Sequence, residues 1–494
     1  MTPPLESTQE ALEPDPLESR EAGAKVIRGG GLRAAAHVIG VLVGVVSAPL
    51  VVRHLGVEDY GRFVLVTSII FIVTGLTEGG LANVAIRQYA TGDRSERRAL
   101  IAALAGLRVV LSVVGSIGAI AFGLIAGYPG VVLAGIGLGC VALLFNNLWG
   151  TLNTALVADL KLTATATIEI VRSLATTLLF LVLVLAGAGL LGFYVVAPAV
   201  AVLTWLVAAT VVRGTVPLVP RRDPARWRAL GRETALYAAA TALGAIYFQV
   251  ALVSTSLLTD DHETGLYGIA FRIVDLANGV PWLLAGSVFP IFAHAALNDT
   301  TRLRYAVGRV TEVGLIVGLW FALTIVLGAK FGIDVVAGAE GEGSVPVLRI
   351  LSIGVGATFL VAAWGFVLLS QQRYRDLLVA NVFAFVLAVV LSVILIPEFG
   401  AKGSAAVTAT LELTLATTYG VLLGRGAEPT RPGATIVPKL LLALAAAFAV
   451  GLPLLLVHPV PATIAGGLVY FAVLWVTGAI PPELLEAVRR RRAS

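Results

Sequence analysis

Long apolar stretches alternate with short polar connections along almost the whole chain. The hydrocarbon core of a bilayer needs roughly 20 apolar residues per helical span. Stretches of that length predict an all-α polytopic membrane protein with 14 transmembrane helices. The predicted spans cover residues 30–52, 62–86, 99–126, 130–157, 165–186, 190–212, 234–258, 265–293, 309–330, 345–369, 376–396, 401–424, 437–457 and 461–480.

Composition supports this fold class. Hydrophobic residues make up 58% of the chain and charged residues 13%, and the mean hydropathy is +0.92. Too few polar residues remain to build a sizeable soluble domain. We therefore expect the protein to act within the membrane.

The distribution of Lys and Arg predicts the orientation. With both termini in the cytoplasm, the cytoplasmic segments hold 26 of the 35 basic residues, the opposite loops hold 4, and 5 lie within spans. Basic residues accumulate in cytoplasmic loops of membrane proteins. The basic loops are interpreted as topology determinants that touch anionic lipid, and no nucleic-acid partner is expected.

Short internal sequence repeats predict two parallel six-helix bundles followed by two extra C-terminal helices. Segments at the starts of corresponding spans match in order: Leu32–Ala36 with Leu236–Ala240, Gly40 with Gly244, Tyr60–Gly61 with Tyr267–Gly268, and Gly189–Gly192 with Gly400–Gly403. Such repeats are typical of transporters that bind substrate between two halves. The predicted parts are a disordered acidic cytoplasmic N-terminus (1–27), an N-lobe (28–213), a basic linker (214–232), a C-lobe (233–424), the two extra helices (425–480) and a basic cytoplasmic tail (481–494).

Cysteine and histidine give no sign of a metal site. Cys140 is the only cysteine, so neither an internal disulfide nor a cysteine-based metal site is expected. The five histidines are scattered without the spacing of a metal motif. We expect no metal and no cofactor.

Three segments resemble the Wzx-type polysaccharide flippases. They read APLVVRHLGVEDYG at residues 48–61, LTEGGL at 76–81 and LYGIAFRIVD at 266–275. Wzx-type flippases belong to the MOP superfamily, with the MATE multidrug exporters and the lipid II flippase MurJ. The resemblance covers about residues 28–480.

The resemblance implies that the chain flips an undecaprenyl-pyrophosphate-linked oligosaccharide from the inner to the outer leaflet of a bacterial inner membrane. This step serves the biosynthesis of a cell-surface polysaccharide and proceeds by alternating access. Proton or sodium coupling and a glycan polymerase partner are left open. A charged pyrophosphate and sugar hydroxyls cannot cross hydrocarbon unassisted, so we expect a cationic cavity between the lobes.

Four residues within the spans are predicted to bind substrate. Arg272 lies near the bilayer centre, one turn from Asp275, and ionisable groups at that depth usually face an interior cavity. A structural ion pair between helices is the alternative. Arg33 in the first span, Arg108 in the third and Asn147 in the fourth complete the predicted set. Arg33 could instead extend its side chain to the membrane surface. Asn147 could instead form hydrogen bonds between helices.

Carboxylates within the spans are candidates for coupling or gating. They are Asp275, Glu412 near the middle of the twelfth span, and Glu78 nearer the cytoplasmic interface. A protonated Glu412 that bonds between helices and a solvated Glu78 are the alternatives. Glu169 and Arg172 also form a pair three residues apart, which is interpreted as structural.

Two other functions compete with the flippase. A MATE-type cation-coupled exporter would move small molecules, but twelve spans rather than fourteen would favour it. A membrane-embedded glycan polymerase or glycosyltransferase would need a larger extramembrane loop or a nucleotide-sugar site, and neither is seen. The chain is therefore predicted to be a transporter and not an enzyme.

Overall fold

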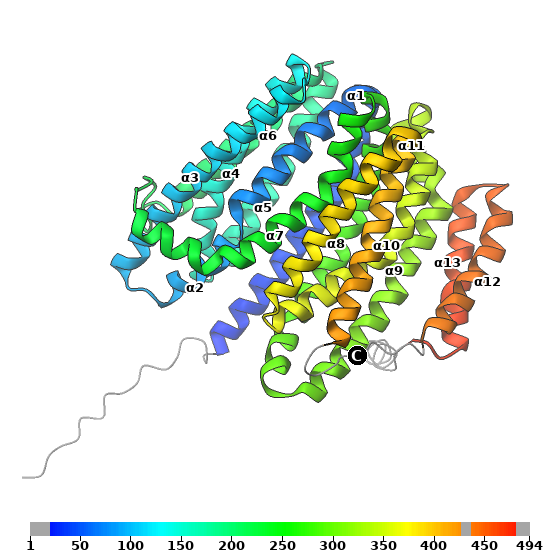
Figure 1. Ribbon diagram of the computed structural model, residues 1–494. Coiled ribbons are helices and arrows are strands. Elements are labelled where there is room, and N and C mark those ends of the chain that lie inside the picture. The colour runs from blue at the N-terminus through cyan, green and yellow to red at the C-terminus, as the bar shows by residue number, and fades with distance from the viewer. Residues whose placement is uncertain (1–19, 426–435, 481–494) are drawn as a thin grey trace, which may run out of the picture.

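The computed structural model describes residues 20–425 and 436–480, and their regular secondary structure is entirely helical (Figure 1). This confirms the predicted all-α fold. Residues 1–19, 426–435 and 481–494 lie outside the described part, and with them most of the predicted N-terminal segment and the whole basic tail. Helix α1 begins at Arg20, so residues 20–27, which were predicted to be disordered, are helical. Alanine, glutamate and lysine in this stretch favour extension of the apolar helix.

The first half of the chain forms six helices, which we call the N-lobe. They are α1 (Arg20–Glu78), α2 (Leu81–Thr91), α3 (Arg94–Ile125), α4 (Gly130–Ala158), α5 (Leu162–Leu185) and α6 (Leu190–Val211). Helix α4 packs against α3 and α6, and α1 packs against α5.

The second half forms the C-lobe and a separate helix pair. The C-lobe holds α7 (Pro224–Leu258), α8 (Asp261–Asn298), α9 (Thr300–Ala337), the 3-10 turn η1 (Gly338–Gly341), α10 (Ser344–Ser370) and α11 (Tyr374–Gly424). Helix α10 lies at its centre, against α8, α9 and α11. Helices α12 (Val437–Leu455) and α13 (Pro459–Val476) pack on each other and on α9, at the edge of the molecule farthest from the N-lobe (Figure 1).

Each of the fourteen predicted spans lies largely on helix, although the span at 62–86 crosses the turn between α1 and α2 and the span at 461–480 runs past the end of α13. Eleven helical segments in the described part are long and apolar enough to cross a membrane, and α7 contributes a shorter apolar segment, Ala242–Leu258. Helices α1 and α11 each hold two predicted spans. Their bends lie at Gly56 (φ 75°) and Gly400 (φ 55°), where a side chain would strain the backbone.

The helix surfaces agree with a lipid environment. Leu185, Leu456 and Val476 are 78%, 91% and 84% exposed, and many other large apolar side chains face outward. A helix that is apolar on all sides needs hydrocarbon around it. The bundle is therefore built to sit in a bilayer.

Aspartates mark where helices leave the apolar zone. Asp93, Asp223, Asp260 and Asp299 cap α3, α7, α8 and α9, and each accepts a backbone N–H of the first turn. The Glu96 backbone N–H, with Ser95, holds the pKa of Asp93 below its usual range. Such charged caps are stable in water and place these helix ends at the membrane surface.

The lobes join along α1 and α8. One hydrophobic core runs through both lobes and includes Val51 and Leu65 of α1 and Ile269 of α8. Near the bend of α1 the backbones come so close that a side chain on Gly61 or Gly265 would overlap the opposite helix. We call this contact the outer seal.

Ion pairs reinforce the outer seal. Arg62 Nε lies 2.7 Å from Asp261 Oδ2, and Arg62 Nη1 lies 2.7 Å from Asp59. Arg53 also donates to the Asp334 carbonyl at 2.7 Å. The two lobes are thus clamped at the end of the bundle where α1 bends.

Candidate substrate-binding site

A cavity of about 590 Å³ lies between the lobes, and we call it the charged cavity. Its walls come from α1 and α5 of the N-lobe and from α8 of the C-lobe, with Asn153 of α4. Hydroxyl groups of Ser173, Thr176 and Thr177 line the α5 side. A polar space at an interface between two bundles is a common form of ligand site.

Two ion pairs provide the charges of this cavity. Arg272 lies 3.3 Å from Asp275 on α8, and Arg172 lies 3.7 Å from Glu169 on α5. All four side chains are between 38% and 43% exposed. The two positive and two negative charges of these pairs cancel. The expected excess of positive charge is therefore not present among the described residues of the cavity. Both arginines are held weakly, because half-exposed pairs contribute little to stability.

Glycines of α1 make room for the arginine of α8. A side chain added at Gly44 would begin 3.5 Å from Arg272 Nη2, and one at Gly40 would begin 3.7 Å from Ser173 Oγ. These glycines are four residues apart and therefore lie on one face of α1. That face forms the floor of the charged cavity.

The structure places the predicted residues in different surroundings. Arg272 and Asp275 line the charged cavity, together with Glu169 and Arg172, which were interpreted as structural. Arg33 lies in α1, seven residues before Gly40, and its side chain lies outside the described residues.

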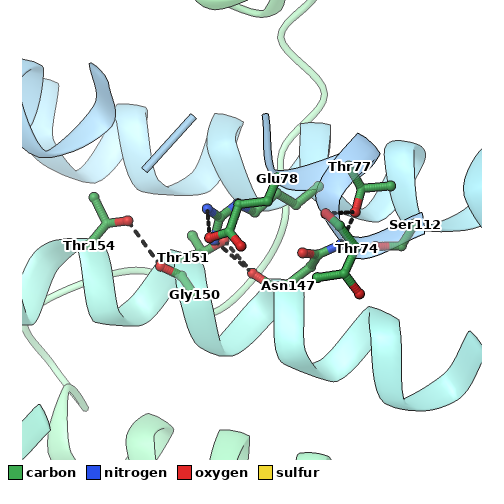
Figure 2. A network of polar contacts seen from close by, with 9 residues as sticks. Thr74, Thr77, Glu78, Ser112, Asn147, Gly150, Thr151 and Thr154 are labelled. Carbon is green, nitrogen blue, oxygen red and sulfur yellow. Dashed lines mark hydrogen bonds and ion pairs between the residues drawn. The ribbon is translucent and has the colours of Figure 1, made fainter. Parts of the chain in front are cut away.

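Arg108 and Asn147 are buried in the N-lobe and do not line the charged cavity. Figure 2 shows Asn147 with Glu78, Thr77 and Ser112. Arg108 is fully buried; its Nη1 donates to the Asn147 carbonyl at 3.1 Å, and its Nη2 lies 3.6 Å from Glu78. The Asn147 amide donates to Ser112 at 2.8 Å and to Thr77 at 3.2 Å. We call this group the N-lobe network. It links α1, α3 and α4.

Glu78 is the counter-charge of the N-lobe network. Nε and Nη2 of Arg108 have no hydrogen-bond partner among the described residues, so the guanidinium depends on the carboxylate of Glu78, which is 50% exposed. Removing one partner of a buried pair costs about 3–5 kcal/mol, and of an exposed pair at most about 1 kcal/mol.

We therefore expect Glu78→Ala to lower the free energy of unfolding by about 2 kcal/mol, between these limits. Thermal unfolding of the purified protein in detergent measures it. Glu342→Ala is the matched control, because Glu342 forms an exposed pair with Lys330 at 3.3 Å. Unchanged stability in Glu78→Ala with reduced transport would instead give Glu78 a direct role in the transport cycle.

Glu412 is buried between α10 and α11. It accepts a hydrogen bond from Thr358 Oγ1 at 3.0 Å and packs against Gly354. It is not among the residues that line the charged cavity. Its single described partner is a neutral hydroxyl, as expected for a carboxyl that bonds between helices or carries a proton.

A second cavity, of about 530 Å³, is lined by the C-lobe and by Phe71 of α1, and we call it the aromatic cavity. Asp275 and Gly279 line both cavities, so the two adjoin along α8. Its aromatic wall is formed by Phe71, Tyr247, Phe248, Trp282, Phe366 and Tyr419. Nothing in the sequence indicated it, because its residues come from five helices and share no local spacing.

Comparisons with known proteins agree with this architecture. The family described as "Polysaccharide biosynthesis protein" matches residues 26–296, more than half of the chain. No curated protein sequence matches. A structure of the lipid II flippase MurJ in an inward closed conformation is 12% identical, with a TM-score of 0.76, over 90% of this chain and 98% of that one.

Two multidrug transporters of the MATE type are also similar in structure. An inward-facing MATE transporter of the MOP superfamily is 15% identical over 80% of this chain and 97% of that one, with a TM-score of 0.65. A Vibrio cholerae MATE transporter is 14% identical over 82% of this chain and 99% of that one, with a TM-score of 0.54. The chain has the fold of the MOP superfamily.

Proposed function

The chain belongs to the polysaccharide biosynthesis protein family, and we propose that it flips an undecaprenyl-pyrophosphate-linked oligosaccharide across a bacterial inner membrane. The observation that carries the proposal is the charged cavity, which lies between two lobes of a transporter fold and holds two arginines. Guanidinium groups bind phosphate through two parallel hydrogen bonds. The substrate moves from the inner to the outer leaflet.

The arginines bind the diphosphate by exchanging partners. In the structure Arg272 pairs with Asp275 and Arg172 pairs with Glu169. A diphosphate carries more charge than one carboxylate and accepts bidentate bonds, so it competes for both guanidinium groups. The released carboxylates can then take up a proton or a sodium ion, which would couple the cycle to an ion gradient. We include Arg33 of α1 as a third arginine that binds the substrate.

Alternating access requires that only one end of the cavity be open at a time. The outer seal, with its close backbones and the Arg62–Asp261 pair, closes the end where α1 bends. The basic linker supports a cytoplasmic location for the other end and for both termini, because Lys and Arg accumulate in cytoplasmic loops. A reporter that is active only outside the cytoplasm should therefore be active when fused after Glu263 and silent after Arg228. The reverse pattern would exclude this orientation.

A MATE-type exporter is the second candidate function. The structural likeness to MATE transporters and the aromatic cavity favour it. A small cationic substrate would bind to aromatic faces without needing the arginines.

Deletion of the gene separates the two functions. Cells without the protein should lose one surface glycan and accumulate its lipid-linked unit on the cytoplasmic leaflet, where no glycan polymerase of the outer leaflet can use it. Complementation with the wild-type gene is the control. An unchanged surface glycan combined with new sensitivity to cationic dyes would support the exporter and reject the flippase.

A further inference from the structure

We propose that the aromatic cavity is a saccharide site, which holds the sugar joined directly to the diphosphate. This inference rests on the proposed function. The diphosphate has two covalent neighbours, the prenyl chain and the first sugar. The aromatic cavity adjoins the charged cavity through Asp275 and Gly279, so a group joined directly to a diphosphate held by the arginines is within reach of it.

The rings of this cavity are suited to sugars. The face of an aromatic ring carries negative charge density, and one face of a pyranose presents C–H groups that are slightly positive. Trp282 and Phe71 line the cavity and are each 48% exposed, so a ligand can reach part of each side chain. Trp282 is braced edge-on by Phe366 at 5.9 Å between ring centroids. The Trp282 ring is therefore held in place without a bound ligand.

Buried amides distinguish a sugar from a prenyl chain. Asn278 is only 5% exposed, lines the cavity, and its Oδ1 has no hydrogen-bond partner among the described residues. Asn381, which is 7% exposed, accepts a hydrogen bond from Tyr419 at 3.4 Å. An unpaired buried carbonyl destabilises a protein, and a sugar hydroxyl would satisfy it. A prenyl chain has no donor, and occupation by it would leave Asn278 unpaired.

The size of the cavity agrees with this assignment. Its volume of about 530 Å³ lies within the range of roughly 300–1,000 Å³ that is usual for small-ligand sites. Gly244 on α7 leaves part of this space open, because a side chain added there would meet only Asn381, at 4.0 Å.

The test compares lipids that differ only in the sugar. The full-length protein in lipid nanodiscs is titrated with undecaprenyl diphosphate and with undecaprenyl diphosphate bearing one glucose, galactose or N-acetylglucosamine. We expect the best of the three to bind about tenfold more tightly than the bare lipid, which corresponds to about 1.4 kcal/mol. Trp282→Leu should remove this difference and leave the Kd of the bare lipid unchanged, whereas Trp282→Phe should keep part of it.

Trp475→Leu is the matched control, because Trp475 is 62% exposed on α13 and lines neither cavity. A second variant covers the case in which Trp282→Leu fails to fold. Gly244→Leu fills the aromatic cavity and should abolish the preference for the glycosylated lipid. Gly118→Leu controls for the added side chain, because Gly118 has nothing within 4 Å.

Each outcome decides the proposal. Equal binding of bare and glycosylated lipids by the wild type would overturn the saccharide site and leave the flippase intact. Loss of affinity for the bare lipid in Gly244→Leu would assign the cavity to the prenyl chain. If the wild type binds none of the lipids, the proposed function fails as well.

Discussion

Arg272→Ala should abolish transport while the protein still accumulates and inserts normally. Arg272 lines the charged cavity on α8 and is 38% exposed, so its removal leaves no unpaired group in a sealed core. Arg272→Lys should retain part of the activity, because the charge remains while the bidentate bonds to phosphate are lost. The measurement is restoration of the surface glycan in deletion cells, with protein level determined in the same membranes.

Asp275→Asn tests the exchange of partners. It removes a negative charge beside the bound diphosphate, and at about 5 Å and an effective dielectric near 20 that repulsion is on the order of 3 kcal/mol before screening. Substrate should therefore bind more tightly and leave more slowly. Arg349→Ala is the matched control, because Arg349 is an exposed arginine within α10 that does not line the charged cavity.

The swapped pair distinguishes a binding role from a structural one. In a purely structural pair, Arg272→Asp combined with Asp275→Arg would restore both membrane level and transport. If Arg272 binds the diphosphate from its own position, the swapped protein should insert and remain inactive. Restored transport would contradict our assignment.

Gly265→Val should open the outer seal. A side chain at Gly265 would overlap the Val57 carbonyl of α1, so the two helices must move apart. We expect loss of transport together with access to the charged cavity from outside. A cysteine at Thr176, in a Cys140→Ala background, should then react with an impermeant maleimide added to intact cells.

Gly118→Val is the control, because its surroundings are open. Labelling at Thr176 that stays at the wild-type level while transport continues would show that the outer seal does not keep the lobes closed. Reduced transport without labelling would place the effect of the valine elsewhere than in opening.

Hydropathy predicted the spans well because the bilayer imposes one simple length requirement on every crossing helix. It also separated the two helical parts of α1 and of α11, which meet at non-helical Gly56 and Gly400. It did not reveal how sharply consecutive spans are joined, because that depends on the backbone at Gly56 and Gly400, where one glycine with a positive φ lets the next helix begin at once. A hydropathy average does not detect a single torsion angle.

The charged residues illustrate the same limit. Spacing identified both i,i+3 pairs, because partners on one helix are fixed by its period. The pair Glu169–Arg172 was interpreted as structural, because no local feature of the sequence shows that this face of α5 lines a cavity. Arg108 offered no local partner in the sequence; its partners Glu78 and Asn147 come from other helices. Contacts between distant segments determine which buried charges meet.

The bend of α1 at Gly56 also has a mechanical consequence. The helix runs without a break from Gly56 to Glu78, which is about 33 Å at 1.5 Å per residue. A rotation of about 10° at Gly56 would move the Glu78 end by about 6 Å, comparable to the shifts of hinge motions. This part of α1 can thus move as a rigid body about a hinge at Gly56, beside the outer seal. Movement of the end at Glu78 then needs no unfolding, only a small change in the torsion angles of one glycine.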